Sequence, residues 1–144
     1  MKNTLNLALV IILTLLSMAC AHTPPDKTLF DRIGGIPVLT VVVSETIDQV
    51  STDPKIKRSF EGIKLAKLKE SVVNQLCRLT GGGCEYDGET MKNSHADLKI
   101  TTAEFELFVQ AFRDALNRHV ATREKNELLK ILAPMKRDIV SDKT

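Results

Sequence analysis

His95 is the side chain with the clearest capacity for chemistry. It follows the glycine-rich stretch 81–83 and precedes a helix-start signal in which Thr101 is followed three residues later by Glu104. A neutral imidazole is the commonest metal ligand among protein side chains. A lone histidine is nevertheless more often a surface residue or a hydrogen-bonded core residue. The segments around His95 must therefore decide whether it binds a metal.

Cys77 and Cys84 are the other candidates for chemistry. Six residues separate them, the chain contains no C-x-x-C motif, and no third ligand lies nearby in the sequence. A metal site built on this pair is therefore disfavoured. Export from the cytoplasm would allow a disulfide between them, and the glycines between them would let the chain turn back. The disulfide and two free thiols both stay open at this point.

The start of the chain has the character of an export signal. Lys2 gives a positively charged start, and 5–18 is an apolar stretch. At about 14 residues this stretch is too short for a typical membrane span and has the length of a signal-peptide core. We therefore predict a signal peptide over 1–19, a tether over 20–27 and one domain over 28–144.

Cys20 stands at the predicted cleavage point, where a bacterial lipoprotein carries the cysteine that becomes lipid-modified. Ser17 occupies the place of the usual aliphatic residue, and Leu16 lies one position further out. We expect a lipid anchor at Cys20 and hence a location in the cell envelope, lipid-anchored or otherwise periplasmic or extracytoplasmic. Ordinary cleavage near Ala19 or Ala21, or an uncleaved anchor, are the alternatives.

The composition disfavours nucleic acid as a partner. The 144 residues carry 20 basic and 18 acidic side chains, a formal net charge of +2, without a basic run. Binding to nucleic acid depends on clustered positive charge. The absence of tryptophan and the single tyrosine also leave little surface on which bases could stack.

Apolar residues recur at helical spacing almost throughout the domain. The expected helices, in chain order, cover 29–33, 37–50, 54–60, 64–80, 101–116 and 128–139. The valine run 41–43 could also be a strand, but the wider spacing and the length of this segment favour a helix. Pro134 is expected to kink the last helix. No confident strand remains, so we predict an all-α fold.

The segment 81–100 stands out because only a short helical turn is expected within it. An irregular segment of this length is unusual inside a compact domain and is often functional. His95 lies near its end, between long apolar helices. A cofactor could replace missing side-chain core at such a place.

Several segments match one family in order and spacing. They are Leu29-Phe30-Asp31-Arg32-Ile33-Gly34-Gly35, then Phe60, then Gly81-Gly82, Tyr86, Gly88 and Met91-Lys92 before His95, and finally Leu98, Ile100 and Phe105. This ordered set, which spans about residues 28–140 without obvious gaps, resembles the group I truncated haemoglobins.

The resemblance implies a truncated globin fold for the domain 28–144, a helical sandwich around a haem pocket. It implies that His95 is the axial ligand of the haem iron, a role that suits a neutral imidazole. The haem b would be held non-covalently, because the chain lacks the C-x-x-C-H attachment motif. The implied function is binding of oxygen, nitric oxide or carbon monoxide, as a carrier in oxygen transport, a scavenger or a sensor.

The resemblance also indicates which residues surround the cofactor. They are His95, Phe60, Leu68, Val72 and Met91. Two lysines are added because of their positions: Lys67 near the apolar stripe of the helix 64–80, and Lys92 three residues before His95. Phe60 would wedge against the haem, and Leu68 would lie nearest the distal face, opposite the axial ligand. Lys67 and Lys92 are candidate partners of the haem propionates, and the alternative is that both lysines simply face water.

The chain departs from the family pattern on the distal side. Ile47 stands where many members carry a tyrosine that bonds to iron-bound oxygen, and Val72 stands where a glutamine often helps. Thr46, Ser71 and Gln75 are polar side chains close enough in sequence to substitute. Bound oxygen is held longer by a distal donor, so we expect weak oxygen binding.

Two questions about function stay open: whether the protein is an enzyme, and whether it binds haem at all. Nitric-oxide dioxygenation needs a stable oxygenated state, so the missing tyrosine favours a binding or carrier protein over an enzyme. The alternative from another class is a haem-free helical lipoprotein with a structural or partner-binding role on the same scaffold. The sequence indicates no particular redox partner.

Overall fold

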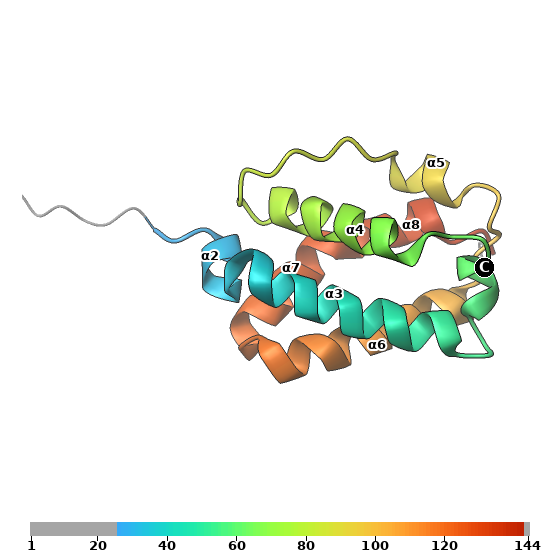
Figure 1. Ribbon diagram of the computed structural model, residues 1–144, viewed down its shortest axis with the longest axis horizontal. Coiled ribbons are helices and arrows are strands. Elements are labelled where there is room, and N and C mark those ends of the chain that lie inside the picture. The colour runs from blue at the N-terminus through green and yellow to red at the C-terminus, as the bar shows by residue number, and fades with distance from the viewer. Residues whose placement is uncertain (1–25, 143–144) are drawn as a thin grey trace, which may run out of the picture.

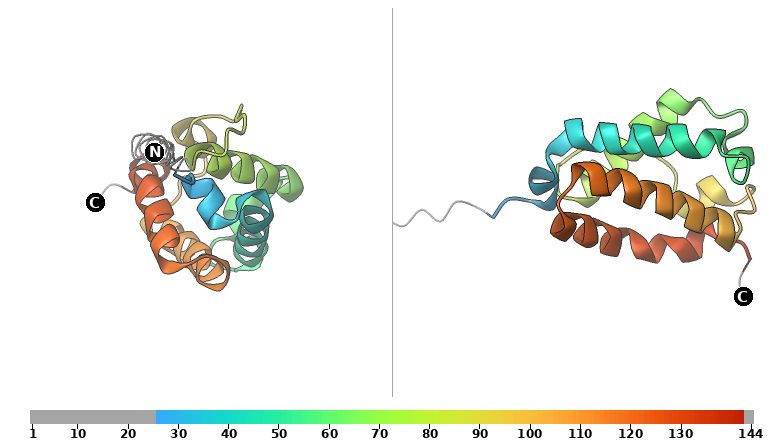
Figure 2. Two further views of the ribbon diagram at one scale, coloured as in Figure 1. Left: turned by 90° about the vertical axis from the view of Figure 1, so that its left-hand side faces the viewer. Right: turned by 90° about the horizontal axis from the view of Figure 1, so that it is seen from below.

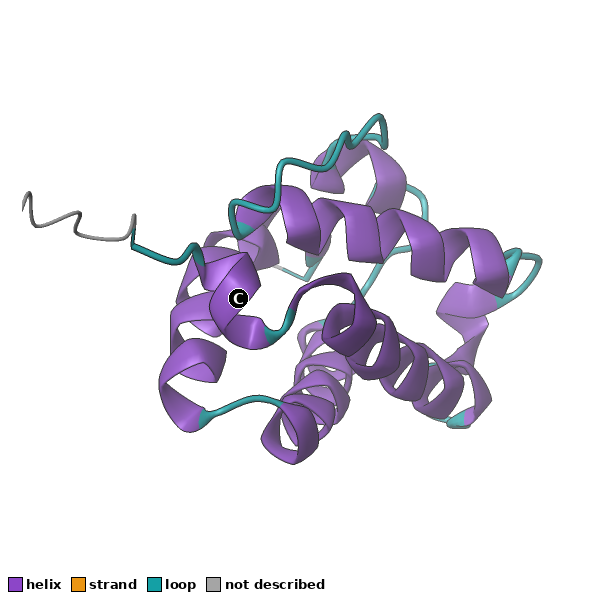
Figure 3. Ribbon diagram, turned by 60° about the vertical axis from the view of Figure 1, so that its left-hand side comes forward, coloured by secondary structure: helices purple, strands orange, loops and turns teal. Residues whose placement is uncertain are grey.

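A computed structural model describes residues 26–142, and this part of the chain folds into an all-α domain (Figures 1 and 3). Its elements are α2 (Leu29–Ile33), α3 (Gly35–Thr52), η1 (Lys57–Phe60), α4 (Leu65–Leu79), α5 (Met91–His95), α6 (Thr102–His119), α7 (Thr122–Leu132), η2 (Ala133–Met135) and α8 (Lys136–Ile139). Within 26–142 the only extended pairing is a bridge between Ile100 and Val140.

The all-α prediction is therefore confirmed. The predicted signal peptide, the lipid-anchor site at Cys20 and most of the tether lie outside the described residues. None of the helices within 26–142 has both the length and the apolar character needed to cross a membrane.

α3 is the central helix, because it packs against both α4 and α6 (Figure 2). Its inward apolar side chains are 0–2% exposed, and they are Leu39, Val42, Val43, Ile47 and Val50. The valine run is thus helical, as its spacing predicts. Gly34 separates α2 from α3 with a φ of 108°, and a β-carbon there would lie 2.6 Å from Cγ2 of Val38. Both the backbone and the packing therefore require the predicted glycine stop.

α6 and α7 close the other side of the core, and α8 follows them and packs against α5. The predicted capping box is formed, since the hydroxyl of Thr101 accepts a hydrogen bond from the N–H of Glu104 at 3.2 Å. α6 then continues to His119, three residues past its predicted end. The predicted final helix breaks at Pro134 into α7, η2 and α8, because proline has no N–H to donate.

A disulfide joins Cys77, near the end of α4, to Cys84, and their Cα atoms lie 5.7 Å apart. The N–H of Gly82 donates to the carbonyl of Cys77 at 2.8 Å and turns the chain back. The segment 82–90 has no helix and runs back along α4 to α5 (Figure 1). Of the two alternatives that the sequence left open, the structure adopts the disulfide.

Breaking this disulfide is expected to lower the free energy of unfolding. The Cys84→Ala variant removes the bond while leaving the buried Cys77 side chain in the core. Loop-closure entropy for so short a loop gives a loss of about 2–3 kcal/mol, measurable by urea unfolding. Alkylation mapping under denaturing, non-reducing conditions provides the check on the unaltered protein. Reactive thiols at both Cys77 and Cys84 would contradict the assignment.

Candidate functional site

His95 ends α5, a single helical turn that contains no buried residue. The turn begins at Thr90, whose hydroxyl accepts a hydrogen bond from the N–H of Asn93 at 3.2 Å. This cap is the local reason for a helix after a long irregular segment. Because α5 contributes nothing to the core, contacts from neighbouring elements must fix its position.

The orientation of the His95 ring is set by its own helix. Nδ1 lies 2.8 Å from the carbonyl oxygen of Met91 and 3.0 Å from Oγ of Ser94. A carbonyl can only accept, so Nδ1 carries the proton and Nε2 has a free lone pair. The hydroxyl of Ser94 donates to the carbonyl of Thr90 at 2.9 Å, which leaves its oxygen free to accept from Nδ1.

This arrangement makes Nε2 of His95 a single, oriented metal donor. Nε2 forms no hydrogen bond to any residue between 26 and 142. In the same range no group of three or more His, Cys, Asp and Glu side chains could hold a metal ion. A lone imidazole with a protonated, hydrogen-bonded second nitrogen suits a metal whose other ligands come from a cofactor.

Arg58 of η1 fixes the backbone that follows His95. Its Nε and Nη2 atoms each donate to the carboxylate of Glu104 at 2.6 Å. Its Nη1 donates to the carbonyl of Leu98 at 3.0 Å, and Nη2 also donates to that of Lys99 at 3.1 Å. Lys99 has a φ of 48°, a left-handed conformation that a side chain disfavours. We refer to Arg58, Glu104 and these two carbonyls as the arginine clamp.

Glu104 is ionised in the clamp although it is only 6% exposed. The Arg58 guanidinium, helped by hydrogen bonds from Thr101, lowers the pKa of Glu104 from its ordinary 4.5 to about 2 despite the opposing effect of burial. The same pairing raises the pKa of Arg58. The clamp therefore keeps both of its charges over the whole physiological pH range.

Residues 141–142, near the C-terminus, also hold the backbone that follows His95. The carbonyl of Ile100 accepts from the N–H of Ser141 at 2.8 Å, and the N–H of Thr102 donates to Asp142 at 2.7 Å. α5 itself packs against α8. The segment after His95 is thus anchored by η1, α6 and the chain end.

On its N-terminal side α5 is linked to α4 by one side-chain contact. Nε2 of Gln75 donates to the sulfur of Met91 at 3.7 Å. The structure thereby brings together Met91 and His95, both predicted site residues, and places them beside α4. Gln75, which the sequence offered as a distal donor, instead holds Met91, the first residue of α5.

The remaining predicted site residues lie on the elements next to α5. Leu68 and Val72 share one face of α4 and pack, half-buried, against the main core. Phe60 in η1 is also half-buried, against a smaller cluster. Lys67 and Lys92 are exposed, and neither is in an ion pair with another residue of the described range.

The polar side chains suggested for the distal side are mostly engaged elsewhere. The hydroxyl of Thr46 is 1% exposed and donates to the carbonyl of Val42 at 2.7 Å. Ile47 is buried in the core beside it. Of the three candidates, only Ser71, which is half-buried, has no hydrogen bond from its side chain to another described residue.

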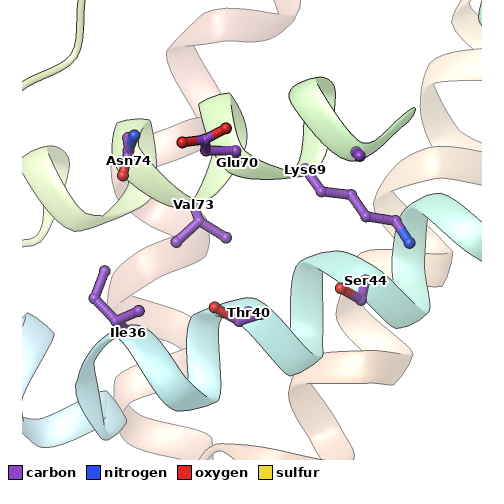
Figure 4. A pocket seen from close by; sticks show the side chains of 8 residues that line it. Ile36, Thr40, Ser44, Lys69, Glu70, Val73 and Asn74 are labelled. Carbon is purple, nitrogen blue, oxygen red and sulfur yellow. The ribbon is translucent and has the colours of Figure 1, made fainter. Parts of the chain in front are cut away.

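A separate groove lies between α3 and α4 and has a volume of about 440 Å³ (Figure 4). It is lined by Ile36, Thr40, Ser44, Ala66, Lys69, Glu70, Val73 and Asn74. None of these is a predicted site residue, and α5 contributes nothing to it. The groove and the arginine clamp were both missed by the sequence reasoning, which found Glu104 only as a helix cap.

Comparison with known proteins places these features in context. The model of the bacterial-like globin family matches residues 28–141. The chain is 31% identical over 115 residues to group 1 truncated haemoglobin GlbN of Mycolicibacterium paratuberculosis, covering 79% of this chain and 85% of that protein. It is 29% identical to the protein of the same name from a Nostoc species, covering 80% and 98% respectively.

Solved structures show the same fold. The ferric truncated haemoglobin of Tetrahymena pyriformis superposes with a TM-score of 0.74 at 20% identity, covering 81% of this chain and 100% of that chain. The haemoglobin of Chloroflexus aurantiacus gives a TM-score of 0.73 at 21% identity, covering 81% and 99%. The overall fold of this chain is therefore that of these structures.

Because of the arginine clamp, the free energy of unfolding should depend on pH in the acid range. The folded-state pKa of Glu104, about 2, lies below its ordinary value of 4.5. Its contribution is thus fully present above pH 4.5 and is lost as the pH falls toward 2. Glu104→Gln should lower the unfolding midpoint temperature at pH 7 and flatten its dependence on pH below 4.5. Equal acid sensitivity in both proteins would show that other carboxylates dominate.

Proposed function

The chain belongs to the bacterial-like globin family, as a group 1 truncated haemoglobin, and from this we propose a haem protein in which His95 ligates the iron and a diatomic gas is bound. The observation that carries the assignment of His95 is the hydrogen bond from its Nδ1 to the carbonyl of Met91 at 2.8 Å. It leaves Nε2 as the nitrogen that would hold the iron.

The residues around α5 fit a non-covalent haem b. One imidazole would suffice, because a porphyrin would supply the remaining nitrogen ligands of the iron. Half-buried apolar side chains at Phe60, Leu68 and Val72 suit the faces of the porphyrin. The exposed amines of Lys67 and Lys92 are free of other ion pairs within 26–142 and suit its propionates. Haem iron supplies the coordination position at which the gas binds.

The distal residues favour a binding or carrier role over catalysis. Ile47 and Val72 offer no hydrogen-bond donor, and the hydroxyl of Thr46 is already bonded to Val42. Oxygen carries partial negative charge when bound and depends on such a donor, whereas carbon monoxide depends on it less. Nitric-oxide dioxygenation, which consumes the oxygenated state, is correspondingly disfavoured.

We also propose that the protein works in the cell envelope, with Cys20 as the lipid-anchor site. The disulfide between Cys77 and Cys84 supports export, because disulfides persist in oxidising compartments and are rare in the cytoplasm. Labelling of the protein with a radioactive fatty acid, lost in Cys20→Ser, tests the anchor. Release of unlabelled protein into the soluble periplasmic fraction would contradict it.

The first test of the function is the removal of the axial ligand. His95→Ala should greatly weaken haem retention and abolish the shift in the absorption spectrum of the ferrous protein when carbon monoxide is added. His119→Ala is the matched control, because His119 lies at the far end of α6 and is bonded to Glu45 at 2.8 Å. An unchanged haem spectrum in His95→Ala would refute the assignment, and an unaltered protein that stays colourless would favour the haem-free alternative.

The second test concerns the distal side. A hydrogen bond to a polarised ligand contributes about 1.5–3 kcal/mol, so Ile47→Tyr should slow oxygen dissociation about ten- to a hundredfold if its hydroxyl reaches the ligand. Ile47→Phe controls for size without the hydroxyl, and stopped-flow release measures both. Slow release in the unaltered protein, lost in Gln75→Leu but insensitive to Ile47→Tyr, would mean that Gln75 is the donor.

A further inference from the structure

The disulfide between Cys77 and Cys84 ties α4 to the start of the segment that leads to His95. We propose that this disulfide is a redox-controlled restraint on the proximal segment 81–95, so that its reduction loosens α5 and speeds the loss of haem. The haem half of this inference rests on the proposed function. The restraint on the segment itself does not.

The N-terminal approach to α5 has few anchors other than the disulfide. Between Cys84 and Met91 every residue except Tyr86 is exposed, and the Tyr86 hydroxyl bonds within the segment, to the carbonyl of Glu89 at 3.1 Å. α5 has no buried residue. Only the weak hydrogen bond from Gln75 to Met91 links this side of α5 to α4 through side chains. The covalent bond is therefore the firmest hold on the approach.

Packing determines which of the two cysteines must move when the disulfide is reduced. Cys77 is fully buried, and a β-carbon on Gly82 would lie 2.5 Å from its sulfur and 2.7 Å from the Phe30 ring. Two unbonded sulfur atoms need more space than two bonded ones. Cys77 cannot move without disrupting the core, whereas Cys84 is half-buried and is preceded by Gly83, which has open space around it. The displacement therefore falls on Cys84 and the segment after it.

Reduction also lengthens the free tether to α5. With the bond intact, the six residues 85–90 separate Met91 from a fixed point at Cys84. Without it, the last fixed point is Gly82, whose N–H donates to the carbonyl of Cys77 at 2.8 Å, and the eight residues 83–90 intervene. The local concentration of a chain end falls roughly as the −3/2 power of tether length, a loss of about 1.5-fold from length alone.

The bond is open to a dithiol reductant from the Cys84 side. The donor thiolate attacks the half-buried sulfur of Cys84, the Cys77 sulfur leaves and takes up a proton, and the second donor thiol then releases Cys84 as a thiol. Two electrons and two protons pass to the protein, and the donor becomes a disulfide. The reverse transfer restores the restraint.

Hydrogen exchange of the haem-free full-length protein tests the restraint directly. After treatment with dithiothreitol, amides in 84–95 should exchange faster at short labelling times, at which amides in the centre of α3, which open only on global unfolding, stay protected in both forms. Ile47 and its neighbours in α3 serve as the internal control, because they lie in the main core. Equal exchange of 84–95 before and after reduction would overturn the restraint.

Haem release tests the consequence at constant iron oxidation state. Ferric Cys20→Ser protein, which keeps the disulfide, is compared with ferric Cys20→Ser/Cys84→Ala protein by transfer of haem to an excess of a haem-scavenging apoprotein. Release from the second should be faster by at least about 1.5-fold. Equal release rates would contradict the redox inference alone. Failure of both proteins to bind haem would contradict the proposed function, and the exchange measurement would still decide the restraint.

Discussion

The Arg58 guanidinium is the point on which the placement of the backbone after His95 depends. It joins η1, the carbonyls of Leu98 and Lys99, and the first turn of α6 through hydrogen bonds of 2.6–3.1 Å. Glu104 could not remain buried and charged without this partner, because an unpaired buried charge is costly. The same pair fixes the corner that carries Phe60. One ion pair thus sets both the corner and the exit from α5.

α4 supplies the complementary hold on the other side of α5. It offers a covalent link at Cys77 and a weak side-chain link at Gln75. The turn that carries His95 is therefore positioned from outside and not by burial of its own residues. Such an element can be released without unfolding the core around α3, since local openings need much less free energy than global unfolding.

The two sides of α3 and α4 have different chemical characters. Toward the proximal turn, polar groups are paired and oriented, as in the bond between His95 and the carbonyl of Met91. At Ile47 and Val72 the side chains are apolar. The hydroxyl of Thr46 donates a hydrogen bond to the carbonyl of Val42 within the same helix. Gas selectivity would then depend mainly on the iron and on the apolar walls, with Ser71 as the one polar candidate not otherwise bonded within 26–142.

The sequence by itself determined the features that depend on neighbouring residues. The glycine stop at Gly34, the capping box of Thr101 and the break at Pro134 are all present, because backbone conformation, capping and the missing proline N–H act over a few positions. The family pattern singled out His95 and the globin fold. Only the tertiary structure brought Arg58 to Glu104, 46 positions away, and Gln75 to Met91, 16 positions away. It also chose the bonded state of Cys77 and Cys84. These outcomes depend on how helices pack, which local spacing does not encode.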